Sequence, residues 1–402
     1  MTRRATFLAG SAALAASAVA PAAALTASPA KGFPTFTWER VPYAAQIGKF
    51  RGDFTPAEVA FIARHFAFIA LGPGTGLGDK PAAERIQEAG FYRNARALKR
   101  ANPECKVLFF WGVPGNIHNY AAYANYDESW RLPNAAGGWG GDASKPGFRR
   151  WWAQSAAHIV AHEDVDGVFV DGANPEGDHP FHTAMLQALR GELDALPKPA
   201  LLLINGVPRG TEPAGPADSK EPAGPATSKE AAGATDTKLP SVLDVCDGIM
   251  IEYFGIVGKK DPDKLKQYML DIVRLGRAGK IVMARAFPGF TFFDPEVRDW
   301  SYARKLAEAK KNVAFSLATY LAVAQRYTYL QYGWGYENIG GAYVLEGDGV
   351  TPDPAWYPEF LAPLGEPLED PVVDGYVFTR RFRHAAVRVD LQAREGRVDF
   401  TS

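Results

Sequence analysis

Two short stretches of the chain share a pattern that ends in a carboxylate. Residues 165–172 read VDGVFVDG and residues 246–253 read CDGIMIEY. In each stretch an Asp-Gly turn precedes three apolar residues and then an acid, Asp171 or Glu252. A continuous apolar run bounded by turn residues is typical of a strand buried on both faces. Because a buried carboxylate is costly unless it meets a polar environment, we expect both acids to emerge into a pocket.

The matched spacing predicts that the two acids act together. Each lies five residues past the Asp of its turn, so both should stand at the same height on their strands. Paired carboxylates at the carboxyl ends of barrel strands are suited to cleaving glycosidic bonds. A pair about 5–5.5 Å apart would retain the anomeric configuration, whereas roughly 6.5–9.5 Å would invert it, and the spacing permits either. The alternative is that both acids are structural and pair with Arg285 or Lys49.

The elements that must position these acids alternate between strand and helix eight times. Such alternation predicts an α/β fold, the (β/α)8 TIM barrel, with the loops after the strands forming the active face. A capping box at Thr55 and Glu58 should start the first helix. The expected strands span residues 40–49, 66–71, 106–111, 200–205, 280–285 and 327–332, with two more ending at Asp171 and Glu252, and the later helices span residues 91–99, 146–162, 180–196, 262–275 and 302–325.

Three polar residues end other predicted strands. Lys49 ends the first, Asn205 the fifth and Arg285 the seventh. Each could bind sugar hydroxyls or an anionic substituent of a substrate, or could equally be a hydrogen-bonding group of the barrel end.

Three aromatic residues lie at or just past strand ends. Trp111, Tyr253 and Trp334 are candidate platforms on which sugar rings stack. The alternative is that they pack in the protein interior. A long loop that ends near residue 141 adds further aromatic residues, and loops of this length are usually functional.

No cofactor or metal is expected. Asp178, His179 and His182 crowd one stretch, but their spacing matches no well-specified metal site. The glycine-rich loop at residues 72–76 lacks the Lys-Ser/Thr of a phosphate-binding loop. Cys105 and Cys246 precede separate strands, so we expect free, buried thiols. The formal charge of −1 does not favour a nucleic-acid partner.

Both ends of the chain depart from the barrel pattern. Residues 1–30 combine twin arginines with an alanine-rich apolar stretch, as a Tat-type export signal does, although the spacing from the arginines to Phe7 differs by one residue. We expect an exported, periplasmic or extracellular protein that leaves the membrane once the signal is cleaved.

Residues 31–350 should form the barrel, and residues 351–402 a small antiparallel β domain with strands over residues 372–378 and 382–391. An approximate nine-residue repeat at residues 210–239 has almost no large apolar residue, so we expect a disordered insertion.

Several stretches together resemble a known family. Residues 38–42, 47–49, the strand ending at Asp171, residues 251–253 and residues 331–336 look like the fifteenth group of the hypothetical glycosyl hydrolase series, distantly similar to the α-galactosidase superfamily. The resemblance implies a nucleophilic Asp after strand four and a carboxylate acid/base after strand six. These positions fall on Asp171 and Glu252. The resemblance also implies that the anomeric configuration is retained. Glu at the second position departs from the commonest relatives, which carry Asp there.

The expected function is therefore cleavage of glycosidic bonds in a poly- or oligosaccharide. One alternative is a catalytically inactive barrel that binds glycan during polysaccharide export or assembly. Another is a barrel hydrolase with a different substrate, because this fold hosts many chemistries. No feature of the sequence indicates an oligomeric state.

Overall fold

A computed structural model describes residues 32–49, 52–77, 86–112, 120–133, 139–172, 180–207, 242–255, 261–291, 293–336, 338–339, 343–344 and 357–401. The expected signal segment and the repeat insertion at residues 210–239 lie outside these ranges. Within them, no helix combines the length and apolarity needed to cross a membrane.

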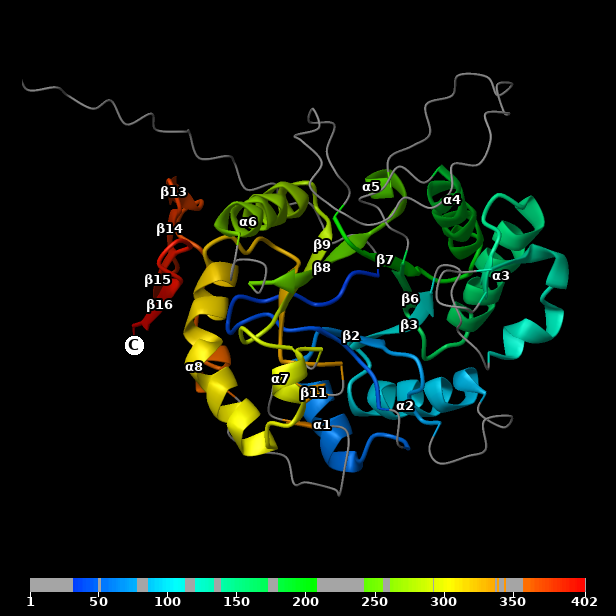
Figure 1. Ribbon diagram of the computed structural model, residues 1–402, viewed down its shortest axis with the longest axis horizontal. Helices are drawn as coiled ribbons and strands as arrows, with labels where there is room; N and C mark the ends of the chain where they lie inside the picture. Colours follow the sequence, from blue (N-terminus) through cyan, green and yellow to red (C-terminus); the bar gives the residue numbers. More distant parts are fainter. Residues whose placement is uncertain are drawn as a thin grey trace, which may run out of the picture.

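Eight parallel strands form the central sheet, which closes into a barrel (Figure 1). The seam lies between the first and last strands, where Leu330 accepts a hydrogen bond from Ala44 (3.1 Å) and donates one to Pro42 (2.9 Å). The predicted (β/α)8 fold is confirmed. The strands follow the order β1 (Ala45–Ile47), β2 (Phe68–Leu71), β3 (Lys106–Gly112), β6 (Gly167–Asp171), β7 (Leu201–Asn205), β8 (Gly248–Phe254), β9 (Ile281–Ala286) and β10 (Thr328–Tyr332).

Helices surround the barrel and cover its outer face (Figure 1). The capping box of the first helix is present, because the Thr55 hydroxyl accepts from Glu58 N and Glu58 Oε2 accepts from Thr55 N. The predicted helices are present, most within a few residues of their expected bounds: α1 (Pro56–His65), α2 (Gln87–Ala101), α3 (Pro146–Val160), α4 (Pro180–Asp194), α6 (Pro262–Arg277) and α8 (Tyr302–Leu321). Two short helices were not predicted, α5 (Val242–Val245) and α7 (Pro295–Arg298).

The first strand is shorter than predicted. Instead of spanning residues 40–49, it consists of β1 and one isolated bridge between Tyr43 and Leu330. Pro42 has no N–H to donate to a strand ladder, which limits regular pairing at its position.

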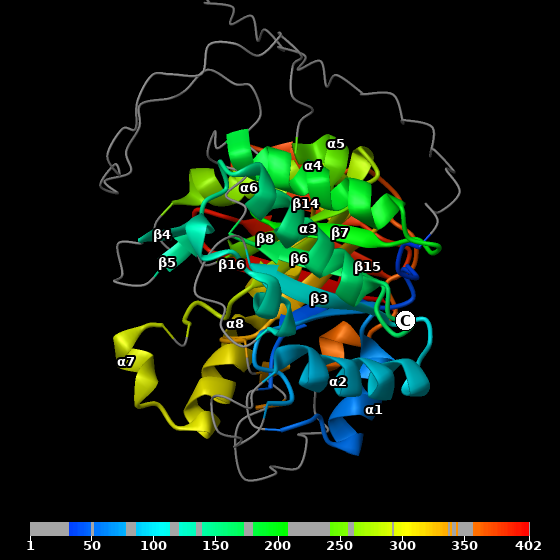
Figure 2. The same ribbon diagram turned by 90° about the vertical axis from the view of Figure 1, so that its right-hand side faces the viewer.

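Irregular segments decorate the carboxyl ends of the strands. After β3 come two short 3₁₀ turns, η2 (Ala121–Asn125) and η3 (Glu128–Trp130), and the hairpin of β4 (Arg131–Pro133) and β5 (Trp139–Gly141). A second short pair, β11 (Asn338–Ile339) and β12 (Tyr343–Val344), follows β10. Figure 2 shows β4–β5 and α7 projecting from the same side of the barrel, which is the side where the parallel strands end.

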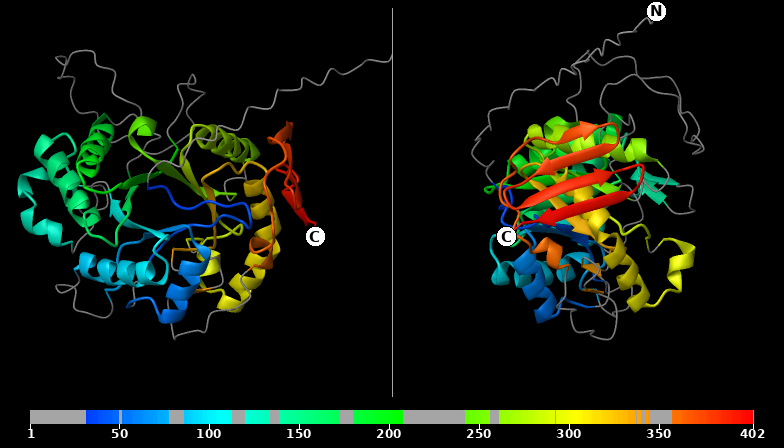
Figure 3. Two further views of the ribbon diagram at one scale, coloured as in Figure 1. Left: turned by 180° about the vertical axis from the view of Figure 1, so that it is seen from behind. Right: turned by 90° about the vertical axis from the view of Figure 1, so that its left-hand side faces the viewer.

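The chain ends in a four-stranded antiparallel sheet packed on α8 (Figure 3). Its strands are β13 (Val372–Asp374), β14 (Val377–Arg381), β15 (Ala385–Asp390) and β16 (Glu395–Phe400), and the turn η5 (Pro358–Phe360) precedes them. The sequence pattern indicated one strand over residues 372–378, which is wrong. Gly375 has φ of +57°, and the chain reverses there, so that Asp374 pairs with Val377. An Asp-Gly pair is a strong hairpin signal that the alternation of apolar residues obscured.

Both cysteines are free and buried, as expected. Cys105 directly precedes β3, and Cys246 lies just before β8. Burial raises the pKa of each thiol to about 12. Both side chains therefore behave as small apolar groups at neutral pH.

Candidate active site

A polar layer caps the apolar barrel interior. Side chains of a strand alternate between its two faces, so residues two apart point the same way. On six strands, a buried apolar residue of the interior is followed two positions later by a polar one. The interior residues are Ala44, Phe169, Leu203, Met250, Met283 and Tyr329, and the polar residues above them are Gln46, Asp171, Asn205, Glu252, Arg285 and Gln331.

The amide of Asn205 joins the two acids. Its Nδ2 donates to Asp171 Oδ1 (2.9 Å) and to Glu252 Oε2 (2.8 Å). Two oxygens that share one nitrogen lie no farther apart than the sum of these two bonds. That limit is below the roughly 6.5–9.5 Å separation of an inverting pair. The structure thus brings together three of the sequence-predicted residues.

The barrel's stagger explains how the acids reach one level. Val170 pairs with Ile204, which in turn pairs with Ile249. Relative to this row, Asp171 is one residue further along its strand and Glu252 is three residues further along. An eight-stranded barrel with shear 8 is offset by about one residue per strand, so two strands compensate for the two extra residues.

A β-bulge sets the direction of Glu252. Ile251 pairs with Ala284 and Phe254 pairs with Ala286, so Glu252 and Tyr253 together oppose the single residue Arg285. Tyr253 has φ of +58°, a conformation that a non-glycine residue seldom adopts. Bulges of this kind are frequent next to active sites, where they redirect a side chain.

The half-buried ring of Tyr253 lies at the same bulge and stacks on the Phe287 ring, with 5.3 Å between centroids. Among the three aromatic candidates, Tyr253 is the one that lies beside the two acids.

Tyr336 is a site residue that the sequence analysis did not select. Its hydroxyl donates a short hydrogen bond to Glu252 Oε1. The loop after β10 carries Tyr336 to the acids, and its carbonyl accepts from Gly48 N (2.9 Å). Burial raises the pKa of the Tyr336 phenol, so the hydroxyl stays protonated at neutral pH. Its position within residues 331–336, one of the stretches that carry the family resemblance, was a signal, but no pattern revealed which way the loop turns.

Arg285 lies beneath this group without binding either acid. It is 1% exposed, and its Nη1 donates to the backbone oxygen (3.2 Å) and side-chain oxygen (3.0 Å) of Gln46. Its Cζ lies 3.8 Å from the centroid of the Tyr336 ring. Burial lowers the pKa of the guanidinium, and the nearby Tyr336 and Glu252 act in the opposite direction.

Lys49 is not part of the paired-acid group. Its ammonium forms a 2.8 Å ion pair with Glu58, and both side chains are buried. Of the alternatives for Lys49, the structure supports that of a barrel-end group. Within the described residues neither Asp171 nor Glu252 makes an ion pair with Lys49 or Arg285, so the structural alternative for the acids is not what the geometry shows.

Trp111 and Trp334 are packing residues. The Trp111 side chain is 2% exposed and lies among the rings of Tyr120, Trp151 and Trp152. Trp334 is 5% exposed and stacks on Phe290. Neither offers an open ring face to a sugar, so their selection as platforms is corrected. An aromatic residue at the end of a barrel strand faces outward or inward according to its register, and Trp111 occupies an outward position.

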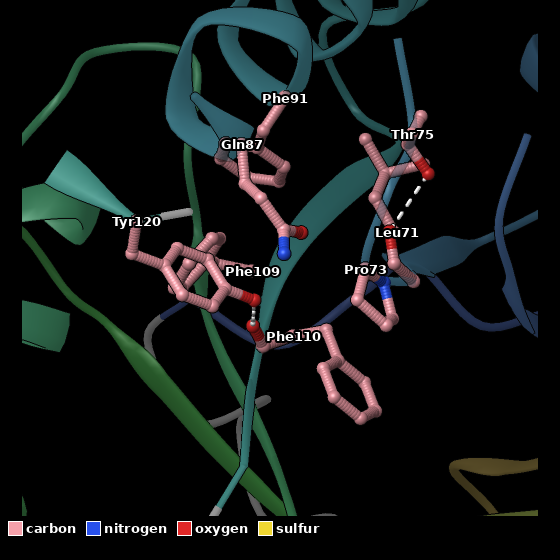
Figure 4. A pocket seen from close by; sticks show the side chains of 9 residues that line it. Leu71, Pro73, Thr75, Gln87, Phe91, Phe109, Phe110 and Tyr120 are labelled. Carbon is pink, nitrogen blue, oxygen red and sulfur yellow. Dashed lines mark hydrogen bonds between the residues drawn. The ribbon is translucent and has the colours of Figure 1, made fainter. Parts of the chain in front are cut away.

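A small pocket opens elsewhere, beside α2 (Figure 4). Its lining includes Gln87, Phe110 and Tyr120, and the Tyr120 hydroxyl donates to the Phe110 carbonyl (3.4 Å). Its cavity volume of about 10 Å³ is far below the usual range for ligand sites, and neither acid lines it. We therefore separate this pocket from the candidate active site.

Among the described residues no group of three or more His, Cys, Asp or Glu side chains is arranged to hold a metal. His182 lies on α4, whereas Asp178 and His179 fall outside the described residues.

Comparisons with known proteins add the following findings. A family model described as hypothetical glycosyl hydrolase family 15 matches residues 99–386. No curated protein matches the chain. Solved structures that resemble it include an α-amylase from Geobacillus thermoleovorans (11% identity, 88% of this chain and 87% of that chain, TM-score 0.49). Another is a β-L-arabinopyranosidase from Geobacillus stearothermophilus (12% identity, 88% and 85% covered, TM-score 0.48).

Proposed function

The chain belongs to hypothetical glycosyl hydrolase family 15 and is a glycoside hydrolase, and on this premise we propose that Asp171 and Glu252 carry out the cleavage. The observation that carries the proposal is that the Asn205 amide donates a hydrogen bond to each of the two carboxylates. Two acids held by one donor at the carboxyl ends of barrel strands meet the requirement for a two-carboxylate mechanism. The substrate is an oligo- or polysaccharide.

Asp171 is the proposed nucleophile. Its Oδ1 accepts from Asn205 and from Gly172 N (2.9 Å), which orients the carboxylate. Its other oxygen, Oδ2, is the atom that attacks the anomeric carbon. The attack forms a glycosyl–enzyme ester and breaks the bond to the leaving-group oxygen.

Glu252 is the proposed general acid/base. In the first step it gives its proton to the departing oxygen, so that the sugar leaves as an alcohol. In the second step it removes a proton from the water that attacks the ester, which restores both side chains. The short separation of Asp171 Oδ1 and Glu252 Oε2, which share the Asn205 amide, supports a retaining mechanism, because an inverting pair needs a wider gap that admits a water.

Two further features complete the proposal. The ring of Tyr253, held at the bulge beside Glu252, contacts the substrate, while Asn205 and Arg285 shape the polar floor. The twin-arginine segment before the barrel directs export to the periplasm or the exterior.

The test begins with a panel of 4-nitrophenyl glycosides and of neutral, amino-sugar and uronate polysaccharides. With the substrate found, Asp171→Asn should abolish turnover and Glu252→Gln should lower kcat by roughly 10²–10⁴-fold, while both variants still bind. Asp194→Asn, at an exposed acid of α4, serves as the control and should keep full activity. Glycan binding that both variants retain, without turnover by the wild type on any substrate, would favour a binding barrel instead.

The stereochemical outcome is tested separately. Proton NMR of the first product formed should show the same anomer as the substrate. Initial formation of the opposite anomer would refute retention and the nucleophilic role of Asp171.

A further inference from the structure

The geometry points to Tyr336 as a positioning residue that stabilises Glu252 as its proton leaves, an inference that rests on the proposed function. Glu252 accepts one hydrogen bond at each oxygen, from Asn205 at Oε2 and from Tyr336 at Oε1. Both donors already point at the carboxylate in the unbound site. Negative charge develops on Glu252 when it protonates the leaving group, so these donors stabilise the transition state more than the ground state.

The chemistry of a phenol suits this task. An amide N–H such as that of Asn205 only donates, whereas a tyrosine hydroxyl both donates and accepts. Tyr336 can therefore accept from Glu252 when the carboxyl is protonated and donate to it when the carboxyl is ionised. Tyr336 forms no covalent bond to the substrate and keeps its own proton throughout the cycle.

Arg285 fixes and polarises the tyrosine. Its guanidinium lies over the Tyr336 ring face at 3.8 Å, in the geometry of a cation–π contact. Its Nε and Nη2 are buried and have no hydrogen-bond partner among the described residues. Among the described residues the guanidinium makes no ion pair with Glu252, and its charge acts on that carboxylate at longer range. A direct ion pair would hold Glu252 ionised and oppose its role as an acid.

The position of Tyr336 is held from outside the acid pair. Gly48 N, just past the end of β1, donates to the backbone carbonyl of Tyr336, and this bond fixes the backbone from which the ring projects. These restraints come from β1, β9 and the loop after β10, which are elements far apart in the sequence. Their convergence on the backbone and ring of one residue distinguishes Tyr336 from a surface tyrosine.

The experiment is Tyr336→Phe in the full chain, assayed on the sugar identified by the panel. Loss of one hydrogen bond to a charged group should lower kcat about 10–100-fold with KM changed less than about threefold. Without this donor the ionised carboxylate of Glu252 loses one hydrogen bond, so the alkaline limb of the kcat/KM profile should move to higher pH in the variant. The acid limb, governed by the nucleophile, should stay in place.

A second substrate isolates the acid step. On the 2,4-dinitrophenyl glycoside of the same sugar, the leaving group departs without a proton, so the deficit of the variant in kcat/KM should shrink to less than about threefold. In the Glu252→Gln background, Tyr336→Phe should add almost no further loss, because coupled residues are not additive.

Tyr320→Phe is the matched control. The Tyr320 side chain is fully buried, and its hydroxyl donates to Thr328 O at 2.8 Å. This hydrogen bond does not involve either acid. This variant should lower the melting temperature and leave the pH profile unchanged. A wild-type profile for folded Tyr336→Phe, or a shift of the acid limb only, would overturn the inference. The proposed function would still stand if Glu252→Gln remained impaired, and it would fail if Glu252→Gln kept full activity.

Discussion

Asn205→Ala tests the single contact that unites the candidate active site. The variant removes the amide that donates to Asp171 at 2.9 Å and to Glu252 at 2.8 Å. A hydrogen bond to a charged group contributes about 1.5–3 kcal/mol. If both hydrogen bonds contribute fully in the transition state, their removal raises the activation free energy by about 3–6 kcal/mol, which lowers kcat/KM by roughly 10²–10⁴-fold.

The assay is the initial rate on an aryl glycoside, combined with thermal unfolding by circular dichroism. Asn102→Ala provides the matched control, because Asn102 also makes two hydrogen bonds, to Ala63 O (2.8 Å) and from Glu104 N (3.0 Å). Asn102 follows the carboxyl end of α2 and has no contact with the acids. We expect the control to lose stability and keep its activity.

The refuting result is equally concrete. A folded Asn205→Ala enzyme with less than about threefold loss of kcat/KM would show that the amide does not organise the acids. Asn205→Asp sharpens the comparison, because it places a third carboxylate against the first two. Like charges at this range repel, so we expect Asn205→Asp to be less active than Asn205→Ala.

Four further predictions concern the scaffold. Glu58→Gln leaves Lys49 buried without its ion-pair partner, so urea denaturation should show a loss of about 3–5 kcal/mol, and a loss below about 1 kcal/mol would contradict the pairing. The thiols of Cys105 and Cys246 should not react with Ellman's reagent at pH 8 until the chain is unfolded, when both should react. Because folding raises their pKa from 9.0 to about 12, unfolding releases protons above pH 9, and stability should fall between pH 9 and 12 more steeply than in a Cys→Ala double variant. Gly396→Val should destabilise the terminal sheet, since a Cβ there would lie 2.6 Å from the Phe315 backbone; an unchanged melting temperature would refute this close approach.

Much of the fold was predictable because a barrel repeats one local rule. Buried parallel strands read as continuous apolar runs, and α1, α6 and α8 begin with recognisable capping residues. The strands that end at Asp171 and Asn205 were therefore placed to within a residue. The hairpin at Gly375 was missed because both of its short strands alternate in the same phase as one longer strand.

The site was only partly predictable because two of its determinants are not local. The bulge that turns Glu252 arises from an extra residue relative to β9, which becomes visible only when the two strands are paired. Tyr336 depends on the path of a loop, and Trp111 on its register against α3. Residue type identified the chemistry of the acids, but tertiary packing decided which neighbouring rings accompany them.

The barrel seam has a consequence for the timing of folding. Beyond the backbone bonds at Leu330, the side-chain amide of Gln331 closes the seam by accepting from Gln46 N (2.9 Å) and donating to Gln46 O (3.0 Å). During synthesis, the first strand must therefore wait with one open edge until nearly the whole chain has left the ribosome. An unpaired strand edge invites association with other chains, so a nascent chain interrupted before β10 should be a substrate for chaperones and proteases.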